Sequence, residues 1–191
     1  MSKLKKGLIT LISVGLIGVG TVKASDNDIN KFSTEITYAK DNNLLKFRPF
    51  DYTSGIQRTD LMLGKKVKNF TIYGYWKSDS KDRSWIGTRI DYGKKFLEDK
   101  LTANIQLRLF KGLNKTANQL YIIPTISHKI KNLNIGLLGY GVKSEGKEPL
   151  FYAGPSAGMN LTNNLSMMGA YTKDVFSNSN MLYWKTNFKF E

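Results

Sequence analysis

Apolar and polar residues alternate along successive segments of roughly ten residues through most of this chain. The segment 100–110 is the clearest case. There Leu101, Ala103, Ile105, Leu107 and Leu109 alternate with Lys100, Thr102, Asn104, Gln106 and Arg108. Successive residues of a β-strand point to opposite faces, so each such segment has one apolar side and one polar side. The pattern predicts an all-β protein without a helical domain.

We predict ten strands, and the pattern allows between eight and twelve. They cover 32–39, 57–64, 68–77, 84–94, 100–110, 118–130, 133–143, 149–161, 164–173 and 180–190. A soluble two-sheet sandwich would show the same alternation. The links after the second, fourth, sixth and eighth strands are short, and the longest link, 40–56, follows the first. Short turns on one side and longer loops on the other favour a closed antiparallel up-and-down transmembrane β-barrel.

Outward-facing aromatic residues fall near the predicted strand ends. Phe32, Phe70, Tyr92, Phe188 and Phe190 fall at the short-turn side, and Tyr38, Trp76, Phe151 and Tyr171 at the long-loop side. Aromatic rings prefer the membrane–water boundary, so two girdles are expected. Trp184, near mid-strand, departs from this pattern.

The first 24 residues have the pattern of a cleaved signal peptide. Lys3, Lys5 and Lys6 precede an uncharged apolar run at 8–20, and Val22-Lys23-Ala24 provides a cleavage site before Ser25. The alternative is a retained anchor, but the run is well short of the roughly 20 residues of a spanning helix. We therefore expect a signal peptide at 1–24 and an outer-membrane barrel domain at 25–191. The chain has no cysteine, which excludes disulfides, thiolate metal sites and a lipid-modified cysteine.

The last strand carries a recognisable motif. Trp184, Phe188 and Phe190 alternate with polar residues and end in an aromatic, and this resembles the closing strand of bacterial outer-membrane β-barrel proteins. The chain departs from that motif at Thr186 and by adding Glu191 after the final aromatic. The resemblance implies a place in the cell outer membrane, contact with its lipid, and recognition by the barrel insertion machinery. It identifies a broad porin-like class and no narrower family.

The formal charge is +14, and about +10 remains without the four lysines of 1–24. If the apolar faces meet lipid, the inner faces carry the basic residues Arg58, Lys77, Arg89, Lys100, Arg108, Lys129 and Lys185 and the tyrosines Tyr73, Tyr75, Tyr121, Tyr152 and Tyr183. A basic lumen favours anionic or acidic-sugar solutes, which predicts a small porin-like channel. In small barrels the same side chains can instead fill the interior, giving a closed structural or adhesive barrel that presents loops.

No catalytic site is predicted. The one histidine, His128, is adjacent to Ser127, and neighbouring strand residues face opposite sides, so they cannot form a dyad. We expect no metal site, no cofactor and no nucleic-acid partner, because export separates the chain from nucleic acid. A lipid-modifying barrel enzyme is a weaker alternative.

Overall fold

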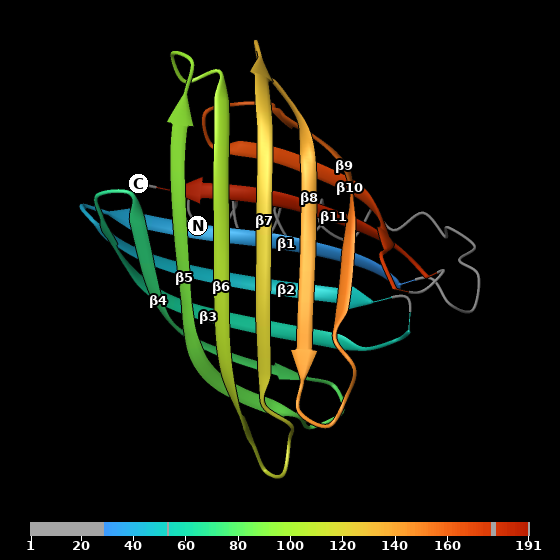
Figure 1. The fold of residues 1–191 in the computed structure, drawn as a ribbon. Helices are drawn as coiled ribbons and strands as arrows, with labels where there is room; N and C mark the ends of the chain where they lie inside the picture. Colours follow the sequence, from blue (N-terminus) through green and yellow to red (C-terminus); the bar gives the residue numbers. More distant parts are fainter. Residues whose placement is uncertain (1–28, 53, 177–178, 191) are drawn as a thin grey trace.

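The computed structural model describes residues 29–52, 54–176 and 179–190, and within these ranges the chain forms a closed β-barrel with no helix. The eleven strands are β1 (Ile29–Lys40), β2 (Asn43–Tyr52), β3 (Gln57–Val67), β4 (Phe70–Asp79), β5 (Ser84–Phe96), β6 (Leu101–Leu113), β7 (Gln119–Ile130), β8 (Leu133–Ser144), β9 (Leu150–Asn160), β10 (Leu165–Asp174) and β11 (Asn180–Phe190). The strands are strongly tilted, so front strands such as β6 cross rear strands such as β1 at a steep angle (Figure 1).

Each strand pairs with its sequence neighbours in antiparallel fashion, and β1 closes the barrel by pairing with β11. An odd number of strands makes the first and last run in the same direction, so this seam is parallel, with Glu35 opposite Asn187. The predicted barrel closure is confirmed. The expectation of an entirely antiparallel, even-stranded barrel is wrong.

The difference arises at 43–52, which we predicted as part of a long loop. The segment is strand β2, and the turn at 41–42 joins it directly to β1. Asp41 takes a positive φ of 54°, a conformation typical of tight hairpin turns. Alternation is weak here because Leu44 and Phe50, which are apolar, lie on the inner face. An apolar residue on each face removes the period-two signal on which strand prediction depends.

The barrel has two distinct ends. The connections 41–42, 68–69, 97–100, 131–132 and 161–164 share one end with the end of β11, and we call it the short-turn end. The remaining connections, which include 114–118 and 145–149, form the long-loop end, where β1 begins. The predicted sorting of shorter and longer links is confirmed for β3 to β11. The direction of β1 is reversed from our expectation, so Phe32 belongs to the long-loop end and Tyr38 to the short-turn end.

Apolar side chains cover the outside of the barrel. Leu63, Ile86 and Leu137 are 64%, 53% and 58% exposed on the outer face. At the short-turn end Phe70 and Tyr92 pair across β4 and β5, with ring centroids 4.8 Å apart. Charged residues such as Asp60 and Arg89 lie buried inside. Large apolar side chains therefore cover much of the outer face, while the interior combines buried charged residues with an apolar cluster that includes Met62 and Phe110.

The predicted signal peptide, 1–24, lies outside the described residues. In the described part of the chain, no helix has the length and apolar character needed to cross a membrane.

Candidate functional site

The barrel interior is the candidate site because the charged and hydrogen-bonding side chains converge there. Ten of the twelve residues predicted to line it lie on inner strand faces: Arg58, Lys77, Arg89, Arg108, Lys185, Tyr73, Tyr75, Tyr121, Tyr152 and Tyr183. The other two, Lys100 and Lys129, are exposed at the short-turn end. Lys100 lies in the turn before β6, and its carbonyl accepts a hydrogen bond from the Lys129 amide at 2.6 Å. Lys100 precedes β6 and Lys129 is the next-to-last residue of β7, so both lysines lie at the rim of the barrel and are exposed.

Every strand contributes a buried inner side chain to a continuous plug. The plug residues are Lys31, Phe50, Asp60, Lys77, Trp85, Phe110, Tyr121, Leu138, Tyr152, Thr172 and Met181, and none is more than 8% exposed. All but Leu138 lie in the part of their strand nearer the long-loop end. Buried inner side chains of all eleven strands therefore gather in that half of the barrel.

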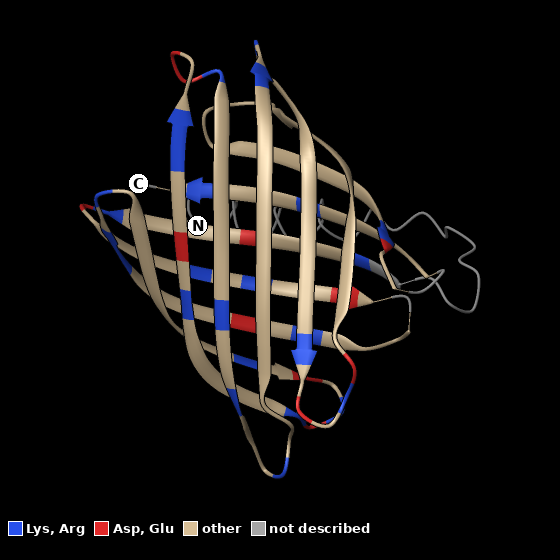
Figure 2. Ribbon diagram, viewed as in Figure 1, with Lys and Arg blue, Asp and Glu red and all other residues tan. Residues whose placement is uncertain are grey.

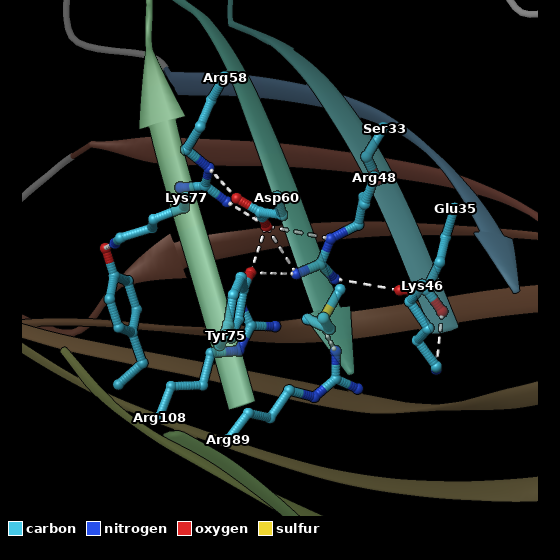
Figure 3. Close-up of polar contacts among 12 residues, drawn as sticks. Ser33, Glu35, Lys46, Arg48, Arg58, Asp60, Tyr75, Lys77, Arg89 and Arg108 are labelled. Atoms are coloured by element: carbon cyan, nitrogen blue, oxygen red, sulfur yellow. Dashed lines mark hydrogen bonds and ion pairs between the residues drawn. The ribbon is translucent and has the colours of Figure 1, made fainter. Parts of the chain in front are cut away.

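An ion-pair network fixes one side of the plug. Asp60, which is completely buried, accepts hydrogen bonds from Arg48 at 2.9 Å and from the Tyr75 hydroxyl. Arg58 also pairs with Asp60: its Nε lies 2.9 Å from Asp60 Oδ1, and its Nη2 donates a hydrogen bond to Asp60 Oδ2 at 3.3 Å. Figure 3 shows Arg48 and Arg58 approaching Asp60 from opposite sides. Charge pairing of this kind allows ionised groups to lie away from water.

Glu35 extends the network toward the short-turn end. Its carboxylate lies 3.0 Å from Lys46, 3.1 Å from Lys185 and 3.4 Å from Arg48. Three cations thus share one carboxylate, and two of these cations come from β2, the strand that sequence reasoning missed. Lys46 and Arg48 alternate with Leu45 and Phe47, which is the one local signal that could have revealed them.

Lys77 is held by aromatic rings and neutral oxygens. Its Nζ lies 4.0 Å from the Phe110 ring centroid and 4.4 Å from that of Trp85. It donates hydrogen bonds to Gln119 Oε1 at 2.5 Å and to the Tyr121 hydroxyl at 3.3 Å. Cation–π contacts away from water contribute about 2 kcal/mol each. Lys31 is held in a similar way, 3.9 Å from the Tyr140 ring centroid.

The other half of the lumen is an open vestibule with a wall of small polar side chains. Thr71, Asn104, Thr125, Ser127, Asn134, Gly136, Ser156, Gly158, Ser166 and Asn187 make up this wall, and none of them is buried. Gly64 leaves room for the ring of Tyr73, which lies against it across β3 and β4. Beside Tyr73 a cavity of about 320 Å³ runs from Glu35 and Lys46 up to the 162–164 turn. The vestibule opens at the short-turn end and stops at the plug.

Positive charge dominates both the lumen and the vestibule rim. Apart from the exposed lysines of the rim, eight inner cations (Lys31, Lys46, Arg48, Arg58, Lys77, Arg89, Arg108 and Lys185) face five inner carboxylates (Glu35, Asp60, Asp79, Asp91 and Asp174) in the described part of the chain. The rim carries exposed lysines at positions 40, 65, 66, 68, 94, 95, 100, 129, 131 and 189. Figure 2 shows many basic residues at the upper left, together with acidic residues in the 41–42 and 97–100 turns.

The structure places the two residues considered for catalysis as predicted. Ser127 is half-buried on the inner face and His128 is exposed on the outer face of β7. No group of three or more metal-ligating side chains occurs within the described residues.

Comparisons with protein-family models and with curated proteins found no match to this chain. The site is therefore interpreted from its own geometry.

Proposed function

We propose that this protein is an integral outer-membrane barrel whose lumen is closed, and that it acts in the envelope as a rigid barrel with one open vestibule. A location in the outer membrane is supported by the apolar outer face of the barrel and by the aromatic residues near both of its ends. Backbone groups cannot remain unpaired in lipid, and barrel closure gives each strand two neighbours.

The single observation that carries the closed-lumen proposal is the burial of the plug. Side chains that line a water-filled channel stay accessible to solvent, whereas Asp60, Met62 and Met181 are 0% exposed. Packed aromatic residues from several strands, such as Tyr75, Phe110 and Tyr121, stack edge to face across the same region. Water and ions have no free path through an interior packed in this way.

Excess positive charge supports a second candidate function, a narrow anion-preferring channel of the porin-like kind. Eight inner cations against five carboxylates among the described residues would concentrate anions in a low-dielectric wall. A channel requires the plug to move aside. A conductance measurement therefore distinguishes the channel from the closed barrel.

Planar bilayer recording distinguishes them. The full-length barrel, purified from membranes and reconstituted in a planar bilayer, is expected to give no conductance steps under a salt gradient. Steps with an anion-selective reversal potential would reject the closed barrel and support the channel. Recovery of the protein in the soluble fraction, folded without detergent, would reject both.

A further inference from the structure

We infer that the floor of the vestibule binds a small oxyanion, a carboxylate or a phosphate, at the guanidinium group of Arg108. This inference rests on the proposed closed barrel, because the plug makes the vestibule a dead end in which a solute can be held. It adds a ligand class and a binding residue to that proposal.

Arg108 is the inner arginine whose charge is left without a carboxylate. It donates from Nε to Gln106 Oε1 at 2.6 Å, and no ion-pair partner lies near it within the described ranges. By contrast, Arg89 forms two hydrogen bonds to Asp91, at 2.6 and 2.7 Å. Arg108 is 7% exposed, and its terminal nitrogens are not among the fully buried polar atoms that lack a hydrogen-bond partner. The terminal nitrogens of this nearly buried arginine thus have no hydrogen-bond acceptor among the described residues, and the guanidinium lies 5.9 Å from the Tyr75 ring centroid.

A second, independent observation is the position of Arg108 directly opposite Arg89. The two residues are paired across β5 and β6, and both point into the lumen. Figure 3 shows their side chains lying close together beneath Tyr75. Like charges placed directly opposite on neighbouring strands repel each other, and Asp91 forms an ion pair with Arg89 but not with Arg108. An anion at Arg108 would offset the second charge.

The path to Arg108 suits a small anion. On the inner face of β6, the residues between Arg108 and the short-turn end are Gln106, Asn104 and Thr102, which are neutral and either half-buried or exposed. The rim lysines around the opening raise the local concentration of anions. The planar guanidinium group donates two parallel hydrogen bonds to carboxylate or phosphate oxygens, which makes it suited to both chemistries.

The test is anion-dependent stabilisation of the full-length barrel in detergent. Thermal unfolding is followed at low ionic strength while sodium phosphate is added in one series and sodium acetate in another. We expect a saturable rise of the unfolding midpoint in at least one series, and the two series identify which oxyanion is preferred. Arg108→Gln should weaken the apparent affinity at least about tenfold, as expected for loss of a charge-assisted hydrogen bond. The matched control is Arg83→Gln, at the opposite end and on the surface, which should retain wild-type affinity.

Unchanged affinity in Arg108→Gln would overturn the inference and assign the effect to the rim lysines. A wild-type barrel that is folded, as judged by its heat-dependent mobility on gels, but shows no saturable response would also overturn it. Conductance in planar bilayers tests the closed lumen independently of anion binding. Binding lost in Arg108→Gln, together with open-channel steps in the wild type, would keep the anion site and reject the plug.

Discussion

Replacing Asp60 by asparagine tests whether the buried charge network stabilises the barrel. The substitution keeps the size of the side chain and removes its negative charge. Asp60 is 0% exposed and lies within 2.9 Å of both Arg48 and Arg58. Asp60→Asn therefore leaves buried guanidinium groups without their shared counter-charge.

The expected cost follows from which cation loses its only carboxylate. Arg48 keeps Glu35 as a partner at 3.4 Å, whereas Asp60 is the one ion-pair partner of Arg58 among the described residues. Removing one partner of a buried ion pair costs about 3–5 kcal/mol, chiefly because the remaining charge stays buried. Because Arg58 is still stacked 4.1 Å from the Phe50 ring centroid, we expect the lower end, about 3 kcal/mol.

Urea unfolding of the protein in detergent micelles, followed by tryptophan fluorescence, measures this loss of unfolding free energy. Asp82→Asn is the matched control because Asp82 is exposed in a turn, and asparagine also accepts its positive φ of 55°. The control should change the free energy of unfolding by less than about 0.5 kcal/mol. A loss below about 1 kcal/mol in Asp60→Asn would refute the idea that Asp60 neutralises buried arginines.

Three further substitutions test the plug, the outer face and the vestibule wall. Phe110→Ala should lower the free energy of unfolding by about 3–5 kcal/mol and create conductance steps in planar bilayers. The control Phe176→Ala, at an exposed position, should do neither. A Phe110→Ala variant that shows no conductance steps would argue against the plug as the barrier. Leu137→Arg places a charge mid-strand on the outer face and should lower the folding free energy in lipid vesicles by about 2–4 kcal/mol. A variant as stable as the wild type in vesicles would contradict contact between this face and lipid. Gly64→Ala should displace the Tyr73 ring at a cost of about 1–3 kcal/mol in thermal unfolding, and no change would mean that the ring is not held against the backbone.

The sequence by itself determined the all-β class and the face on which most residues lie. Period-two alternation separates the two faces of a strand, so the spacing alone places the leucines of β6 on one face and Arg108 on the other. The same reasoning placed Ser127 and His128 on opposite faces. The rim positions of Lys100 and Lys129 were missed because alternation specifies a face but not where a strand ends.

Only the tertiary structure decided the strand number, the parallel seam and the contacts among the inner side chains. Strand β2 escaped prediction because its inner face carries apolar residues such as Phe50, which stacks against Tyr52 and against the guanidinium of Arg58 on β3. Whether Lys77 lines a water-filled passage or lies among Trp85 and Phe110 depends on barrel width and stagger, which join residues far apart in the chain. Local pattern fixes the direction of each side chain, but the packing across the lumen depends on all eleven strands together.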